Sequence, residues 1–221
     1  MLLPGKTLYL DTETDGLYPN KNSIISLSVI YVEDGIPKGK KTFWICPKIL
    51  LSCKKAYESE KHDPVKLAAR LKEADKEYNI QQATHGILPS VAITFDAPSV
   101  VFPQILKFLE KFVDPFKKNK DKFADKLHAA GHNTDFDMRM LKGLFESQGH
   151  KFFYSFFGPP MYDTMLLAQQ LRAMGHVFAE NCKLEVLCKA FGIPIEAHNS
   201  ASDIMATYML HLRLLRYVME Q

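Results

Sequence analysis

The sequence predicts a single-domain α/β protein with one sheet covered by helices on both faces. Two observations support this class. Strand-like runs joined by short turns fill the first part of the chain, and segments of helical spacing alternate with a short strand after residue 97. The chain has 221 residues and a mass of 25.2 kDa, enough for one well-buried core and short for two domains.

Composition excludes several classes of protein. No apolar run approaches the roughly 20 residues that span a bilayer, and the N-terminus lacks the regions of a signal peptide, so we expect a cytoplasmic protein without a membrane partner. Its four cysteines show no metal-binding spacing and are expected to be reduced and buried. A net charge of +3 permits a polyanionic partner without requiring one.

Three strands are expected near the N-terminus, at residues 7–16, 23–32 and 41–46, and their short connections predict an antiparallel meander. The first strand ends in Asp11 and Glu13, whose side chains point to the same face because side chains alternate along a strand. The two carboxylates repel each other, and a divalent cation between them would remove the repulsion. The alternative is a strand that simply continues into a polar turn.

The middle of the chain has a different character. Residues from about 53 to 80 are expected to form a helical insertion, with helical spacing at 65–74 that fits a surface helix, a lid or a partner contact. An amphipathic helix is predicted over 100–113. The basic stretch 114–122 is expected to be an exposed connection, with phosphate contact as the alternative.

Strand and helix units follow. A short strand is predicted at 127–132, and Asn133 is expected to cap a helix that runs to Gln148 and carries Asp137 in its first turn. The aromatic residues of 152–157 fit a core position better than base stacking.

Three helices complete the prediction. Asp163 or Thr164 is expected to cap the next helix, and residues 183–192 are expected to form another. The last helix begins near Ser200, with Asp203 in its first turn in an arrangement like a capping box.

The acids form a pattern when they are taken together. Asp11 and Glu13 at a strand end and Asp137 and Asp203 in the first turns of two helices supply the charge for two metal ions about 3.5–4 Å apart, as in phosphodiester cleavage. His198, five residues before Asp203, could accept the proton of an attacking water. Each residue also has a structural alternative, as a helix cap, a first-turn acid or a surface histidine.

The chain resembles the DEDDh class of 3′–5′ exonucleases. The resemblance is carried by DTETDGL at residues 11–17, GHNTDFD at residues 131–137 and HNSASD at residues 198–203, with lesser similarity at 84–87 and 184–193. In the second motif Asp137 is preferred to Asp135 because it follows Phe136, as the family pattern requires. Asn199 rules against the tyrosine subclass, which has Tyr at that position.

The resemblance implies a fold and roles for individual residues. It implies a ribonuclease H-like mixed sheet flanked by helices on both faces. The implied metal ligands are Asp11, Glu13, Asp137 and Asp203, with Asp11 bridging two Mg²⁺ or Mn²⁺ ions, and the implied general base is His198.

The resemblance also implies contacts to the substrate. Thr14, Leu17 and His85 would surround the terminal nucleotide. Leu17 would act as a wedge against the last base or, alternatively, would be a turn residue that packs on the core.

The expected activity is metal-dependent 3′–5′ hydrolysis of single-stranded or frayed DNA in DNA repair, with release of nucleoside monophosphates. RNA is the alternative substrate, and a non-catalytic nucleic-acid-binding module is the alternative class, although all five catalytic positions hold competent residues. The first motif is most similar to proofreading exonucleases related to the epsilon subunit of bacterial DNA polymerase III. Asp15 and the insertion depart from that group. The long tail that epsilon uses to hold its polymerase is also lacking, so a polymerase partner is possible but not indicated, and we expect a stand-alone enzyme or one with a different partner.

Overall fold

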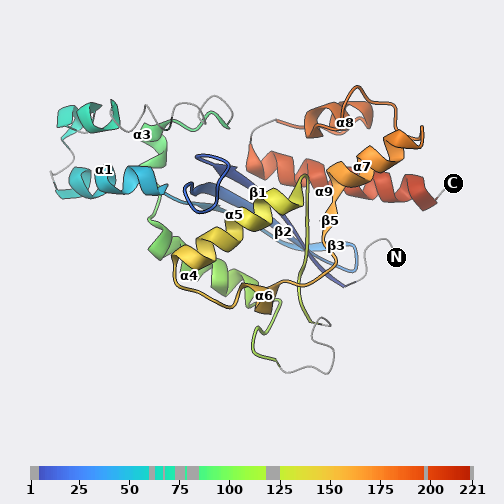
Figure 1. The fold of residues 1–221 in the computed structure, drawn as a ribbon, viewed down its shortest axis with the longest axis horizontal. Helices are drawn as coiled ribbons and strands as arrows, with labels where there is room; N and C mark the ends of the chain where they lie inside the picture. Colours follow the sequence, from blue (N-terminus) through green and yellow to red (C-terminus); the bar gives the residue numbers. More distant parts are fainter. Residues whose placement is uncertain are drawn as a thin grey trace.

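The centre of the protein is a five-stranded mixed sheet with the strand order β3-β2-β1-β4-β5 (Figure 1). The strands are β1 (Lys6–Thr14), β2 (Ile24–Glu33), β3 (Ile36–Trp44), β4 (His128–Gly131) and β5 (Tyr162–Asp163). β1 pairs antiparallel with β2 and parallel with β4. This computed structural model describes residues 5–59, 63–66, 68–72, 78, 85–117, 125–196 and 199–219.

Helices cover both faces of this sheet (Figure 1). They are α1 (Lys48–Ser59), α3 (Pro89–Ala92), α4 (Pro98–Leu109), α5 (Thr134–Ser147), α6 (Phe153–Phe156), α7 (Thr164–Ala173), α8 (Leu184–Ala190) and α9 (Ser200–Met219). Helices α4 and α5 pack on one face, and α9 packs on the other. The predicted α/β sheet between two helical layers is confirmed.

β1 is buried on both of its faces. Leu8 and Leu10 belong to the apolar cluster beneath α4 and α5, whereas Tyr9 belongs to the cluster beneath α9. All three side chains are 0% exposed. Because side chains alternate along a strand, Asp11 and Glu13 continue the Tyr9 row toward α9 at the carboxyl end of β1.

The antiparallel meander of β1, β2 and β3 is confirmed, with a difference in the extent of β3. β3 begins at Ile36 rather than residue 41, because its first residues are polar or exposed at the sheet edge and carry no apolar strand pattern. Outside the meander, β5 pairs parallel with β4, and its two residues are too few for periodicity to reveal.

The predicted insertion overlaps a helix and lies partly outside the described residues. α1 already begins at Lys48, and residues 60–62, 67, 73–77, 79 and 80 are not among those that the structure describes. Tyr78 is 0% exposed and packs in a cluster with Ile25 and Leu50. The described part of this segment therefore packs against the beginning of β2, and the division of the chain at 53–80 stays a prediction. Residues 118–122 of the predicted basic connection also lie outside the described ranges.

Asn133 is the N-cap residue of α5 as predicted, although its side chain does not make the capping bond, and of the two predicted caps of α7 the structure shows Asp163. Asn133 has a left-handed backbone, with φ of 71°, and its side chain makes no capping bond. The Asp163 carboxylate instead accepts from Thr134 N at 2.8 Å and from Asn133 N at 3.2 Å. It also accepts from Met165 N at 2.9 Å, so one carboxylate caps α5 and α7 together.

The aromatic stretch at 152–157 and the four cysteines can be compared with their predicted burial. Phe153, Phe156 and Phe157 are buried as predicted, but Phe152 and Tyr154 are 56% and 63% exposed. All four cysteines are free and buried. Among the described residues, no helix combines the length and the apolar character needed to cross a membrane.

Candidate metal site

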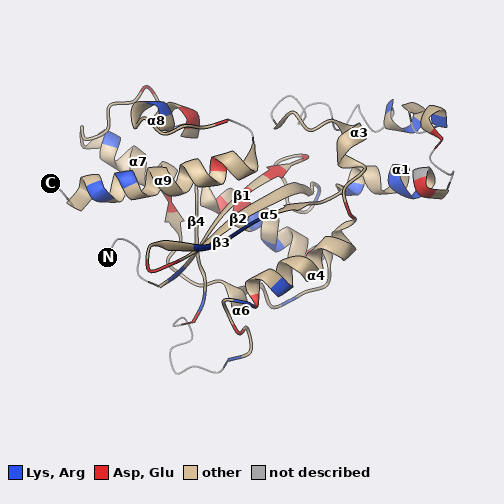
Figure 2. Ribbon diagram, turned by 180° about the vertical axis from the view of Figure 1, so that it is seen from behind, with Lys and Arg blue, Asp and Glu red and all other residues tan. Residues whose placement is uncertain are grey.

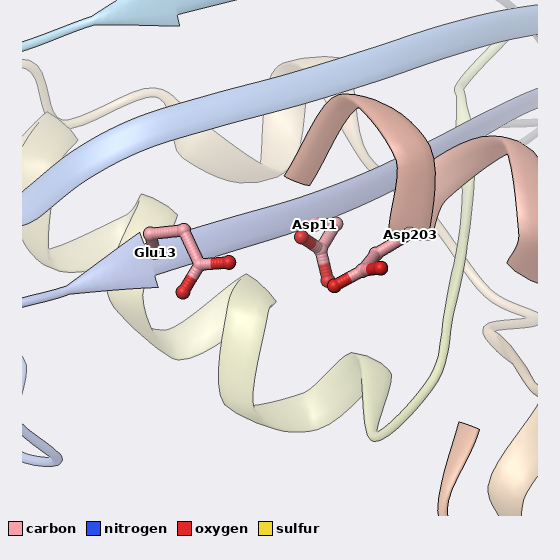
Figure 3. A group of neighbouring side chains, drawn as sticks. All are labelled: Asp11, Glu13 and Asp203. Atoms are coloured by element: carbon pink, nitrogen blue, oxygen red, sulfur yellow. The ribbon is translucent and has the colours of Figure 1, made fainter. Parts of the chain in front are cut away.

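Three carboxylates meet where β1 ends and α9 begins. Asp11 and Glu13 come from β1, and Asp203 comes from the first turn of α9 (Figure 3). One oxygen from each lies within 4.8 Å of the oxygens of the other two. Figure 2 shows the same region from behind, with red acidic segments on β1 and near the start of α9. Oxygen ligands of this kind suit hard divalent cations such as Mg²⁺ or Mn²⁺.

The electrostatics of this group favour a bound cation. Burial, followed by the charges of Asp137 and Glu13, raises the pKa of Asp11 well above its ordinary value. Burial, followed by the charge of Asp203, raises the pKa of Glu13 to about 7. Burial and mutual repulsion therefore disfavour the charged forms of these carboxylates, and a divalent cation would offset both effects.

Asp137 comes from α5, on the opposite side of β1 from α9, and its carboxylate is held by the strand itself. It is 4% exposed, and its Oδ1 accepts from Thr12 N at 3.0 Å and from the Thr12 hydroxyl at 2.6 Å. Burial outweighs these two hydrogen bonds and raises the pKa of Asp137 to about 7. Its carboxylate is not part of the three-acid group, but its charge is the second cause of the raised pKa of Asp11.

A serine cluster fixes the start of α9 against the strands that carry the acids. Ser28 lies opposite Asp11, and Ser26 lies opposite Glu13, in the β1–β2 register. The Ser200 hydroxyl, 2% exposed, lies 2.9 Å from the hydroxyls of both Ser26 and Ser28. Asp203 follows Ser200 by three residues, so this serine cluster sets where the third carboxylate stands.

A second buried contact fixes α9 further along its length. The Tyr9 hydroxyl and His211 Nδ1 are 2.7 Å apart. Tyr9 precedes Asp11 by two residues on β1, and His211 follows Asp203 by about two turns of α9. Burial lowers the pKa of His211 to about 4, so this imidazole is neutral at neutral pH. The contact therefore adds no charge near the acids and aligns α9 with β1.

The predicted general base lies outside the described residues. The structure describes residues 125–196 and 199–219 on either side of His198. Asn199 Oδ1 accepts from Ala201 N at 3.1 Å and so caps α9 in the position next to His198. The role of His198 stays a prediction.

The predicted substrate-contacting residues have different environments. Leu17 is 62% exposed, so the packed-turn alternative does not describe it. Thr14 is buried, and its hydroxyl donates to Gly16 O at 2.9 Å. His85 is 6% exposed, its Nδ1 accepts from Ile87 N at 3.0 Å, and its ring packs edge-on against Tyr78.

The Asp15 carboxylate is buried and hydrogen-bonded within its own loop. Asp15 is 9% exposed, and its carboxylate accepts from Ser23 N at 2.5 Å. Asn22 Nδ2 donates to the Asp15 carbonyl at 3.0 Å, and an added Cβ at Gly16 would lie 2.2 Å from the same Asn22 nitrogen. Asp15 therefore closes the loop that follows β1.

Sequence reasoning missed the serine cluster, and one signal could have found it. Ser26 and Ser28 alternate within an otherwise apolar strand that is almost fully buried. Buried hydroxyls need hydrogen-bond partners, so two of them on the face of the acids indicate a polar contact from another element. The identity of that partner, Ser200, depends on long-range packing and had no signal in the sequence.

Comparison with solved structures identifies the fold. Exonuclease I with bound product is similar over 99% of this chain, with a TM-score of 0.67 and 16% sequence identity. A zinc-bound complex of E. coli exonuclease I with single-stranded DNA matches 99% of this chain, with a TM-score of 0.66 and 17% identity. E. coli exonuclease I in complex with a dA16 oligonucleotide matches 98%, with a TM-score of 0.64 and 18% identity.

This chain spans less than half of those proteins, covering 46%, 43% and 43% of them respectively. No protein-family model matches the chain. No curated protein matches it in sequence either. The likeness establishes the ribonuclease H-like mixed sheet that the resemblance implied, here in one domain.

Proposed function

We propose that this chain is a metal-dependent 3′–5′ exonuclease of the DEDDh class that acts on single-stranded or frayed DNA and releases nucleoside monophosphates. The observation that carries the proposal is the convergence of Asp11, Glu13 and Asp203 within 4.8 Å on a fold shared with exonuclease I. A fold alone supports many activities, so the argument depends on the acids. We propose residues 1–221 as one exonuclease domain.

The acids would divide the work between them. Asp11, Glu13 and Asp203 would hold one divalent cation, and Asp137, already oriented by Thr12, would complete a second position with Asp11. The bound ions would supply a nucleophilic water and stabilise charge on the leaving oxygen. His198 would take the proton of the attacking water, because a neutral imidazole accepts protons near neutral pH.

Single-stranded DNA is the favoured substrate class. Two of the similar proteins are described as complexes with single-stranded DNA or a dA16 oligonucleotide, and the net charge of +3 is compatible with a polyanion. Leu17 is exposed directly after the acid-bearing strand, where it would contact the terminal base, with Thr14 and His85 as the other proposed contacts. RNA is the alternative, because discrimination would depend on contacts to the 2′-hydroxyl.

The test is a cleavage assay with 5′-labelled single-stranded DNA and with RNA of the same sequence. Each strand is incubated with Mg²⁺, with Mn²⁺ and with chelator, beside an Asp11→Ala variant. We expect a ladder that shortens from the 3′ end with metal and is lost in the variant and in chelator.

The preferred strand decides between the DNA and RNA alternatives. A protein that binds both strands but shortens neither with any metal would show a non-catalytic binding module instead. Shortening from the 5′ end, or shortening that persists in chelator, would contradict the proposed mechanism.

A further inference from the structure

An exposed tyrosine stands between two hollows on the α5–α6 side of the protein. Tyr154 of α6 is 63% exposed and lines both hollows, which measure about 350 Å³ and 340 Å³. The second is lined mainly by apolar side chains such as Met138 and Met161. An aromatic ring with open apolar space beside it is the kind of surface on which a base stacks.

Lysines surround this ring. Lys142 Nζ lies 5.5 Å from the centroid of the Tyr154 ring, and Lys126 Nζ donates to the Tyr154 carbonyl. Lys151 lines the first hollow. Among the described residues lining the two hollows, Glu146 is the carboxylate, and it pairs with Lys142 at 3.5 Å. The balance is positive, which favours a polyanionic partner.

A second pair of the same kind lies in the loop that follows the acid-bearing strand. Tyr18 is 63% exposed, and Lys21 Nζ lies 5.7 Å from the centroid of its ring. The loop is held by the hydrogen bond from Ser23 N to the Asp15 carboxylate. Tyr18 is therefore presented on a fixed loop five residues after Glu13.

The two aromatic–lysine pairs are joined by a close contact. The loop packs on α5 at Gly143, where an added Cβ would lie 2.9 Å from the Cβ of Pro19. Pro19 is next to Tyr18, and Gly143 is next to Lys142. Asp137 precedes Lys142 by five residues on α5, a rise of about 7.5 Å along the helix. The two exposed pairs therefore lie on two segments that meet at this contact, one following Glu13 in β1 and the other following Asp137 on α5.

We infer that Tyr18, Lys21, Lys142 and Tyr154 form a track for single-stranded nucleic acid on the 5′ side of the nucleotide being removed. Bases stack on the two tyrosines and phosphates lie near the two lysines, without dependence on base sequence. The inference rests on the proposed function, because that function supplies the strand and its direction. It assigns these four side chains to binding, outside the proposed metal ligands.

The test measures binding without cleavage. The anisotropy of 5′-fluorescein oligodeoxynucleotides is followed in chelator for wild type, Tyr154→Ala and Phe178→Ala. Phe178 is 88% exposed between α7 and α8 and serves as the matched control. Tyr154→Ala should weaken binding of a strand of about 12 nucleotides by roughly 5- to 100-fold, the effect of losing one stacked base, and should leave a dinucleotide unaffected. Phe178→Ala should bind both as wild type does.

A second variant tests the phosphate contact. Lys142→Ala should reduce the slope of log affinity against log salt by about 0.7, the value for one phosphate of a single strand. Lys189→Ala, which removes the same charge from an exposed position on α8, should leave the slope unchanged. Equal slopes for the two variants would overturn the track.

The outcomes separate this inference from the proposed function. Wild-type affinity of Tyr154→Ala for the long strand overturns the track even if the enzyme cleaves. Weakened binding in a protein that cleaves neither DNA nor RNA supports the track and rejects the exonuclease. Absence of binding to any strand overturns both.

Discussion

The two faces of β1 hold their acids in opposite ways. On the α5 face, Asp137 receives two hydrogen bonds from Thr12, at 3.0 Å and 2.6 Å. On the α9 face, Asp11 and Glu13 meet Asp203, and the described residues show no hydrogen-bond donor to the two β1 carboxylates. The Asp137 carboxylate is oriented by hydrogen bonds from the protein. The carboxylates of Asp11, Glu13 and Asp203 instead face one another, with room for a cation between them.

The difference separates folding from function. A carboxylate that accepts protein hydrogen bonds contributes to the fold with or without a ligand. Buried carboxylates that repel one another oppose folding until a cation neutralises them. We therefore expect substitutions on the α9 face to remove activity without loss of stability, and substitution of Asp137 to affect both.

The largest effect is expected from Asp203→Asn. Loss of a ligand from the three-acid group should lower kcat by about 1,000-fold or more, because bound metal contributes several kcal/mol of transition-state stabilisation. Asp135→Asn is the matched control, since Asp135 is exposed in the first turn of α5 and pairs with Arg139 at 2.9 Å. Steady-state hydrolysis of labelled single-stranded DNA measures both variants. Equal losses would show that the three-acid group has no special role.

A smaller effect is expected when the position of Asp203 is loosened. Ser200→Ala removes both hydroxyl contacts to β2, and we expect kcat to fall by about 10- to 100-fold with little change in KM, as for misplaced groups near a metal. Thr42→Ala is the control, because Thr42 also contacts Ser28, at 2.8 Å, but lies on β3. Added Mn²⁺ should recover part of the Ser200→Ala loss. A purely structural role would instead lower the melting temperature and leave kcat of the folded fraction unchanged.

Substitutions on the two faces of β1 should also differ in their effect on the stability of the protein. At pH 5, where Asp137 is protonated, Asp137→Ala leaves the buried Thr12 donors without their partner and should lower the free energy of unfolding by roughly 1–3 kcal/mol. At pH 8 without metal, Asp11→Ala removes a repelling charge and should not destabilise the chain. Urea denaturation followed by circular dichroism measures both. Similar destabilisation by the two variants would contradict the contrast between the faces.

The finest test is the pH dependence of stability. The pKa of Glu13 rises from 4.5 to about 7 in the fold, so the folded state binds more protons than the unfolded state between these values. The metal-free protein should therefore lose stability as pH rises through that window, and most of the loss should be complete above pH 7. Mg²⁺ should raise the melting temperature more at pH 8 than at pH 5. Glu13→Gln should flatten the metal-free profile.

Local patterns predicted much of the fold and most of the acids. The strand that carries Asp11 and Glu13 ends in a D-x-E pattern, and alternation alone places both acids on one face. Asp203 was found because first-turn acids follow recognisable helix-start signals.

The remaining features depend on contacts between distant segments. The hydrogen bond by which Asp163 caps α5 joins residues about 30 positions apart in the sequence. The hydrogen bond between Ser200 and Ser26 of β2 joins residues more than 170 positions apart. The exposed tyrosines were also outside the reach of pattern reading, because Phe153 and Tyr154 are neighbours with opposite burial.

The most direct test of the account is calorimetric titration of the metal-free protein with Mg²⁺ and Mn²⁺ at pH 8, beside Asp11→Ala and Asp135→Asn. The three-acid group predicts saturable binding by wild type and by Asp135→Asn, and its loss in Asp11→Ala. Binding that is absent in wild type, or that survives unchanged in Asp11→Ala, would contradict the claim that the α9 face of β1 is built around a cation.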